Sequence, residues 1–130
     1  GKQGENIAVD YLRRRGFEII TRNFRKPYGE IDVIAKDPLG AVRFVEVKTV
    51  SCEMPGEFVS RETKYGVVPH GTSHRPEDNV HPAKLRKLAR VEQVYISAYK
   101  IEKWQFDVVT VLLDLPNKVA KAALLEDVIL

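Results

Sequence analysis

An apolar run with two opposite charges at its centre is the strongest constraint that this sequence places on its fold. Residues 42–50 read Val-Arg-Phe-Val-Glu-Val-Lys-Thr-Val, and their β-branched residues predict a buried strand. Because strand side chains alternate between faces, Glu46 and Lys48 share one face with Phe44. Burying these charges is costly unless they are paired or bind a ligand. The fold must therefore bring a partner to this strand.

Two further acids are expected near the same point. Asp32 lies inside a second strand-like segment, residues 29–35. Glu5 lies in a predicted helix, three residues before Ala8 and seven before Leu12, and therefore projects toward the packed side of that helix. If the helix covers the two strands as neighbours, Glu5, Asp32 and Glu46 converge.

The order of predicted elements is αβββαβ. A helix between the third and fourth strands permits a parallel crossover, so we expect an α/β fold with a mixed central sheet flanked by helices. The expected elements are a helix at 2–15, strands at 17–23, 29–36 and 41–50, a helix starting at Pro82 and a strand at 104–113. Residues 37–40 form a turn by their residue types. Residues 119–125 suit either a helix or a final edge strand.

The length of 130 residues predicts one domain, 1–130, with a long loop at 51–80. No stretch has the length and apolarity of a membrane span or the pattern of a signal peptide. The single cysteine, Cys52, excludes an internal disulfide, and these features together predict a cytoplasmic protein. A zinc site formed by Cys52 with His70, His74 and His81 is an alternative that the spacing supports weakly.

The net charge of +3 is distributed unevenly. Residues 1–26 hold seven Lys/Arg against three acids, and residues 81–100 hold five against one. Two basic segments favour a polyanionic partner such as nucleic acid. The alternative is that Arg13 and Arg14 simply stabilise the negative end of a helix dipole.

Carboxylates beside a lysine suit metal-dependent phosphodiester cleavage. Asp32 and Glu46 supply the oxygen ligands that Mg²⁺ prefers, and the carbonyl of Val47 is a further candidate ligand. Lys48 can orient the attacking water or stabilise the charge that develops on phosphate. From the spacing alone, a structural Glu–Lys pair on a solvated sheet face is the favoured interpretation. Asp107 is either a further carboxylate of the site or a structural hydrogen-bond acceptor.

Several motifs in order resemble the YraN-like family of small, uncharacterised bacterial proteins. The matching pieces are Gly4-Glu5-x-x-Ala8-x-x-Tyr11-Leu12, Gly16-Phe17-x-Ile19-Ile20-x-x-Asn23-Phe24-Arg25, Gly29-Glu30-Ile31-Asp32-Val33-Ile34-Ala35, Phe44-Val45-Glu46-Val47-Lys48-Thr49, Pro82-x-Lys84-x-x-Lys87-Leu88 and Phe106-Asp107-Val108-Val109-x-Val111. That family resembles archaeal Holliday-junction resolvases and, more broadly, PD-(D/E)xK restriction-endonuclease-like nucleases. The resemblance implies a restriction-endonuclease-like fold and a Mg²⁺ site at the matching positions Glu5, Asp32, Glu46 and Lys48.

The resemblance further implies an endonuclease acting on DNA, with branched or structured DNA as a candidate substrate and Mn²⁺ as a substitute for Mg²⁺. A homodimer is expected, because such relatives often cut two strands. Basic residues expected to hold the DNA backbone are Arg13, Arg14, Lys84, Lys87 and Arg90. The alternatives are a nucleic-acid-binding module that does not cut and, less favoured, a protein–protein adaptor.

Overall fold

The computed structural model describes residues 2–52, 62–63, 66–67 and 82–128. Its elements are α1 (Lys2–Arg14), β1 (Glu18–Lys26), β2 (Gly29–Lys36), β3 (Val42–Cys52), β4 (Glu62–Thr63), β5 (Gly66–Val67), α2 (Pro82–Tyr99), β6 (Trp104–Asp114) and β7 (Val119–Leu125). The predicted αβββαβ order is therefore confirmed, and residues 119–125 form the edge strand. The candidate zinc ligands His70, His74 and His81 lie outside the described residues.

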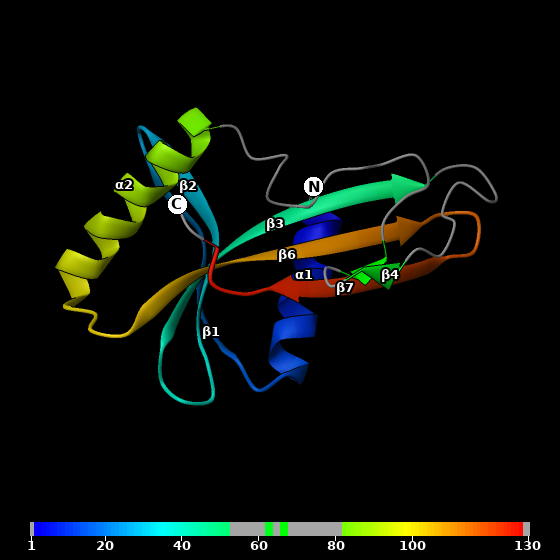
Figure 1. Ribbon diagram of the computed structural model, residues 1–130, viewed down its shortest axis with the longest axis horizontal. Coiled ribbons are helices and arrows are strands. Elements are labelled where there is room, and N and C mark those ends of the chain that lie inside the picture. Colours follow the sequence, from blue (N-terminus) through cyan, green and yellow to red (C-terminus); the bar gives the residue numbers. More distant parts are fainter. Residues whose placement is uncertain (1, 53–61, 64–65, 68–81, 129–130) are drawn as a thin grey trace.

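Five strands form one mixed sheet in the order β1-β2-β3-β6-β7 (Figure 1). β3 pairs with β6 in parallel, whereas the other neighbours are antiparallel. Within the described part of the chain, the short strands β4 and β5 pair with each other as a separate sheet. The predicted mixed sheet is confirmed, and its parallel pair follows from the crossover through α2.

The two helices cover opposite faces of the sheet. On β3, Phe44 packs in the hydrophobic cluster beneath α2, whereas Val45 packs in the cluster beneath α1. Leu12 is the largest fully buried side chain that α1 contributes, and Leu88 and Val91 anchor α2. Among the described residues, neither helix combines the length and apolarity needed to cross a membrane.

The end of α1 is fixed by local sequence. Gly16 has φ +87°, its N–H donates to the carbonyl of Arg13, and the N–H of Phe17 donates to the carbonyl of Leu12. These two bonds form a Schellman motif, which needs a residue with positive φ after the helix. Phe17 is therefore buried directly before β1, rather than continuing the helix.

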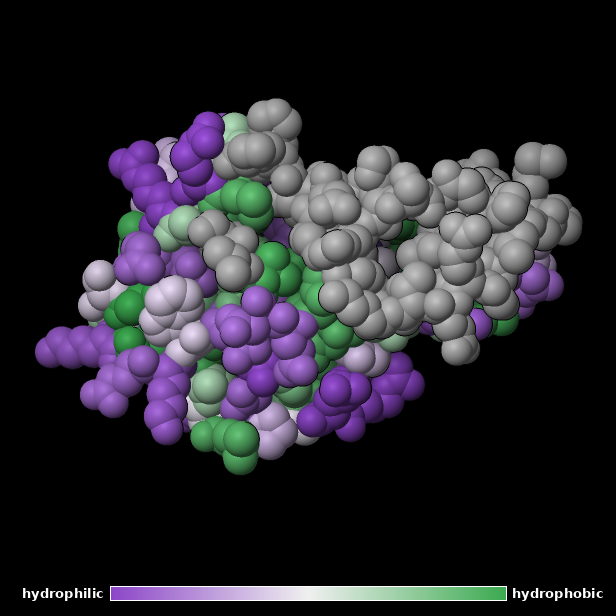
Figure 2. Space-filling model, in the orientation of Figure 1, coloured by the Kyte–Doolittle hydropathy of each residue, from purple (hydrophilic) through white to green (hydrophobic). Residues whose placement is uncertain are grey.

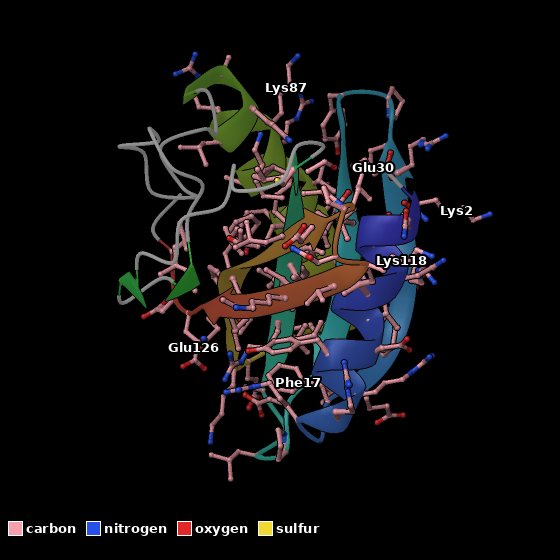
Figure 3. The ribbon with its side chains drawn as sticks, turned by 90° about the vertical axis from the view of Figure 1, so that its right-hand side faces the viewer. Lys2, Phe17, Glu30, Lys87, Lys118 and Glu126 are labelled. Atoms are coloured by element: carbon pink, nitrogen blue, oxygen red, sulfur yellow. The ribbon has the colours of Figure 1, made fainter. Side chains whose placement is uncertain are left out.

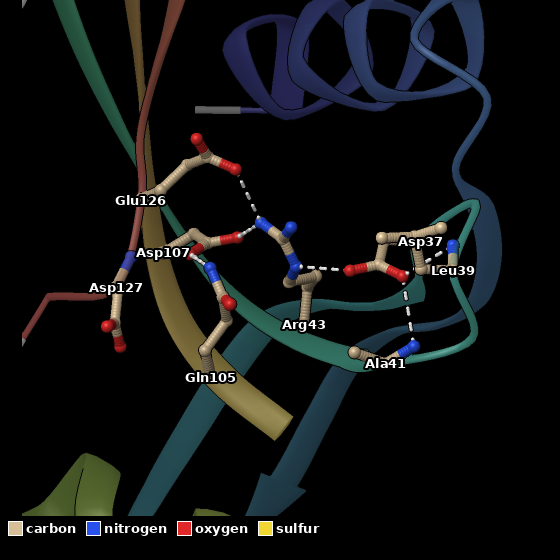
Figure 4. Close-up of polar contacts among 8 residues, drawn as sticks. All are labelled: Asp37, Leu39, Ala41, Arg43, Gln105, Asp107, Glu126 and Asp127. Carbon is tan, nitrogen blue, oxygen red and sulfur yellow. Dashed lines mark hydrogen bonds and ion pairs between the residues drawn. The ribbon is translucent and has the colours of Figure 1, made fainter. Parts of the chain in front are cut away.

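Arg43 joins three separate segments at one end of the sheet (Figure 4). Its guanidinium bonds to Asp37 in the β2–β3 turn at 2.9 Å, to Asp107 on β6 at 2.7 Å and to Glu126 after β7 at 3.0 Å. Asp107 is fully buried and also accepts bonds from Gln105 and the N–H of Asp127. Of the two expectations for Asp107, the structural acceptor is the one that these contacts match.

The same turn is held by the Asp37 carboxylate. Burial alone would raise its pKa, but the N–H groups of Ala41 and Leu39 and the side chain of Arg43 donate to it and hold the pKa below its ordinary value. Gly40 supplies the φ of +92° that closes the turn. The residue types thus account for the tight connection that places β2 beside β3.

Replacing Arg43 by Met should reduce the free energy of unfolding by about 3–5 kcal/mol, because Asp37 and Asp107 would remain buried without their cation. Urea unfolding at pH 7 measures this change. The matched control is Arg25→Met, which removes an exposed ion pair with Glu30 and should cost less than about 1 kcal/mol. Equal losses of unfolding free energy in the two variants would contradict the stabilising role of the Arg43 network.

Glu92 on α2 is a buried carboxyl with an unsatisfied oxygen. It is 2% exposed, and its Oε1 has no hydrogen-bond partner among the described residues. Burial raises its pKa to about 7 from an ordinary value of 4.5. The folded protein therefore holds a proton that the unfolded chain releases between these two values, so stability falls as pH rises through this window.

The variant Glu92→Gln should abolish this contribution. We expect its unfolding free energy to exceed that of the unsubstituted protein by about 3 kcal/mol at pH 8 and to match it near pH 4, from about 1.4 kcal/mol per pKa unit. Urea unfolding across this range measures the difference, with the exposed Glu102→Gln as control. A difference that does not change with pH would contradict the buried, protonated carboxyl.

A candidate metal site where the sheet divides

The sheet divides at Asp32 and Glu46. Pairing between β2 and β3 runs from Lys36 with Val42 only as far as Val33 with Val45. Beyond this point β2 continues beside β1, while β3 continues beside β6. The next residues on the two diverging strands are Asp32 and Glu46, so both carboxyl groups face the gap that opens between them.

A backbone N–H donates across this gap to a side chain. The N–H of Val47 donates to Oδ2 of Asp32 at 2.8 Å, in place of a ladder bond between the two backbones. The regular alternation of β2 is interrupted at the same residue, because Ile31 packs beneath α2 whereas Val33 packs beneath α1. Asp32 is therefore placed between the two layers of the protein and not on one face.

The opposite strand is irregular at the same level. Asn23 on β1 has φ +54°, in the left-handed region that asparagine tolerates better than most residues. The pairing of β1 with β2 registers Arg22 with Val33 and Phe24 with Ile31, and Asn23 falls between them. The predicted strand 17–23 consequently continues to Lys26, because Asn23 forms an irregularity and not an end.

Glu5 reaches the gap from α1. Its Oε1 accepts bonds from Nε of Arg22 at 3.0 Å and from Nδ2 of Asn23 at 3.1 Å. A cavity of about 480 Å³ brings Glu5 together with Asp32 and Glu46. The full lining of this first cavity is Lys2, Glu5, Asn23, Asp32, Glu46, Val47 and Thr49. The helix phase thus places Glu5 where the sequence predicted.

A second cavity opens on the α2 side of the same carboxylates. It has a volume of about 290 Å³ and is lined by Gly29, Glu30, Asp32, Glu46, Lys84, Lys87 and Leu88. Glu46 is 6% exposed, and its Oε1 accepts a short charge-assisted hydrogen bond from Nζ of Lys84. Asp32 and Glu46 therefore line both cavities, one beneath each helix.

Crowded carboxylates change the protonation of Asp32. Burial raises its pKa most, the neighbouring charge of Glu46 raises it next, and the net result is a pKa of about 7. The N–H of Val47 opposes this rise, while Glu5 adds a smaller effect in the same direction as Glu46. The site consequently holds more negative charge than its surroundings accommodate well, a condition that a bound cation relieves.

Not all predicted residues meet at the site. Lys48 has the same strand phase as Glu46 but lines neither cavity. Arg13 and Arg14 lie at the last turn of α1, and Glu5 lies at its first turn, about 12 Å away at 1.5 Å per residue. On α2, by contrast, Lys84 and Lys87 border the second cavity. Arg90 stacks its guanidinium 4.1 Å from the ring centre of Tyr28.

Sequence reasoning did not assign Arg22 or Asn23 to the site, and it predicted Lys84 only as a contact to the DNA backbone. Asn23 and Arg22 hold Glu5, and Lys84 is the cation that contacts Glu46. An asparagine inside a strand pattern is unfavourable, and this signal could have identified Asn23. The contact of Lys84 joins residues 38 positions apart and depends on how α2 packs, for which the sequence carries no local signal.

The two cavities and the Arg43 network lie toward opposite ends of the molecule (Figure 3). Lys2, Glu30 and Lys87, which border the two cavities, lie toward one end. Phe17 and Glu126, which contact Arg43, lie toward the other. The Arg43 network therefore stabilises the sheet away from the candidate site.

Residues 4–111 match the protein family described as "Uncharacterised protein family UPF0102". The chain belongs to this family. The YraN-like resemblance is thereby confirmed, and the matched range includes every residue of the two cavities except Lys2.

Curated UPF0102 relatives extend over most of the chain. A UPF0102 protein of Caldicellulosiruptor bescii is 36% identical over 131 residues, covering 98% of this chain and 93% of the relative. One of Persephonella marina is 35% identical over 114 residues, covering 86% and 82%. One of Thermodesulfovibrio yellowstonii is 37% identical over 112 residues, covering 85% and 83%. The names of these UPF0102 proteins state no activity.

Within the UPF0102 fold, close packing at Gly4 sets the position of Glu5. A Cβ on Gly4 would overlap Oγ1 of Thr49 and lie 3.0 Å from its Cβ, so only glycine lets α1 approach β3 this closely. Gly4→Ala should therefore shift α1 and reduce the free energy of unfolding by about 1–3 kcal/mol. Urea unfolding measures this loss.

The matched control is the double variant Gly4→Ala/Thr49→Ala, in which the colliding side chain is shortened. It should recover at least half of the loss, since contacting residues couple energetically. Purely additive effects would show that the contact of Gly4 with Thr49 does not set the helix position.

Proposed function

We propose that this chain is a Mg²⁺-dependent endonuclease that hydrolyses phosphodiester bonds in DNA, with branched or structured DNA as the candidate substrate. The observation that carries the proposal is the convergence of Asp32, Glu46 and Glu5 on one cavity where the sheet divides. Buried and half-buried carboxylates that converge on one cavity are costly for stability, and a cation ligand is a physical reason for their arrangement.

The donor set suits Mg²⁺ in particular. This ion prefers oxygen ligands, keeps several waters and usually takes only one or two carboxylates from the protein. Among the described residues, no three Asp, Glu, His or Cys side chains form a ready-made metal cage. Asp32 and Glu46 would therefore bind the ion directly, with Val47 as a carbonyl ligand and Glu5 acting through water.

The remaining residues have complementary roles in this proposal. The bound metal would supply an activated water and neutralise charge on the phosphate. Arg22 and Asn23 orient Glu5 by binding its Oε1. Lys48 was the predicted cation for the developing charge, and Lys84 is better placed for this role because it already contacts Glu46.

A DNA backbone would lie across α2. Lys84, Lys87 and Arg90 are exposed on this helix, and hydrophilic side chains project around it (Figure 2). Neutralising phosphates with these side chains releases counterions, so DNA affinity should fall steeply with salt. Arg13 and Arg14 would contact DNA only where it extends past the far end of α1. A homodimer that cuts two strands stays a prediction.

One observation favours a second candidate, a nucleic-acid-binding module that does not cut. Lys84 already neutralises Glu46, as a structural ion pair would. In that case the carboxylates would contribute to stability only. Metal binding distinguishes the two candidates, because only the endonuclease requires it.

Asp32→Asn and Glu46→Gln should each abolish Mn²⁺ binding in calorimetry and lower DNA cleavage by at least about 100-fold, because each removes a charged ligand. The substrates are linear, flapped and four-way-junction DNAs, incubated with Mn²⁺. The control is Asp10→Asn, an exposed acid on α1, which should retain both properties.

Salt-sensitive DNA binding without metal binding would replace the endonuclease by the non-cutting module. Cleavage that persists in Asp32→Asn would indicate a contaminating nuclease and contradict the proposed site. A chain that binds neither metal nor DNA would exclude both candidates.

A further inference from the structure

Lys84 holds a position that helix stability does not explain. α2 begins at Pro82, so Lys84 lies in its first turn, and that turn contains no acid. A cation there faces the positive end of the helix dipole, which is unfavourable. An unfavourable local choice with a specific tertiary partner is expected at functional sites.

The helix that carries this lysine packs closely on β2. A Cβ on Gly29, the first residue of β2, would lie 3.1 Å from Cγ2 of Val91 and 3.6 Å from Cβ of Lys87. Glycine thus lets α2 rest directly on the strand that carries Asp32 three residues later. This packing holds α2 beside the divided sheet, where Lys84 and Lys87 line the second cavity with Asp32 and Glu46.

The ion pair itself is asymmetric. The side chain of Glu46 is 7% exposed, whereas that of Lys84 is 53% exposed. The carboxylate is fixed in the protein, while the ammonium lies on a long, flexible chain that water can reach. The lysine can therefore leave Glu46 without being buried elsewhere, whereas Glu46 always needs a cation.

We propose that Lys84 is a built-in competitor for the metal at Glu46. In the metal-free protein its ammonium occupies the carboxylate that a divalent cation would bind. When the cation enters, Lys84 swings away and remains beside the second cavity, where it faces the phosphate of a bound nucleic acid. This inference rests on the proposed metal site and adds a regulatory role for one residue.

A competitor and a supporting residue affect metal affinity in opposite ways. Loss of a supporting residue would weaken metal binding. Removing Lys84 should increase metal affinity, because Glu46 loses its internal cation and a positive charge leaves the site. We expect Lys84→Met to bind Mn²⁺ about tenfold more tightly in calorimetry, a factor that corresponds to about 1.4 kcal/mol. The same variant should cleave DNA at least tenfold more slowly at saturating Mn²⁺.

The matched control is Arg86→Met, which removes an exposed cation two residues away on the same helix and should leave Mn²⁺ affinity within about twofold. Thermal unfolding gives a second measurement. Lys84→Met and Lys84→Gln should both show a larger Mn²⁺-induced rise in Tm than the unsubstituted protein, even if the metal-free variants are less stable.

Equal or weaker Mn²⁺ affinity in both Lys84 variants would overturn the competition while leaving the metal site intact. Mn²⁺ binding that is detectable only after Lys84 is replaced would support it. If neither the unsubstituted protein nor the Lys84 variants bind Mn²⁺, the proposed metal site fails together with this inference.

Discussion

The hydrogen bond from Val47 to Asp32 is the contact on which the candidate site depends. At this point β2 and β3 separate, although they pair from the β2–β3 turn up to Val33 and Val45. The side chain of Asp32 accepts the hydrogen bond that a backbone carbonyl would otherwise accept. The bond holds the Asp32 carboxylate in the gap between the strands. It also fixes the position of Glu46, because Glu46 directly precedes the donor Val47. A regular ladder here would leave no room for a cavity, because paired backbones stay about 5 Å apart.

Stability and chemistry are separated along the sheet. In the network around Arg43, the buried carboxylates of Asp37 and Asp107 are paired with a cation. This network lies at the end of the sheet where β3 is paired with both β2 and β6. At the open end, Asp32 is crowded by Glu46, and Lys84 compensates the charge of Glu46. The stability that the Arg43 network supplies can thus offset the unfavourable crowding of carboxylates at the other end of the sheet. Such a division is typical of functional sites.

Local rules predicted most of the fold. Helix phase placed Glu5, strand alternation placed Glu46, and turn residues located the β2–β3 connection, since each depends on neighbours within a few positions. The site itself was predicted less completely. The conformation of Asn23 and the contact of Lys84 arise from packing between distant segments, and Lys48 was favoured because the sequence shows spacing but not where a strand separates from its neighbour.

The order of elements along the chain also determines when the site is completed during synthesis. Val42 pairs with Trp104, and Lys84 follows Glu46 by 38 residues, so the β2–β3 hairpin leaves the ribosome well before α2. At 5–20 residues per second, this delay is roughly two to eight seconds. During that interval Asp32 and Glu46 exist without their lysine. The hairpin of a nascent chain thus presents Glu46 without its cation, which the arrival of α2 supplies.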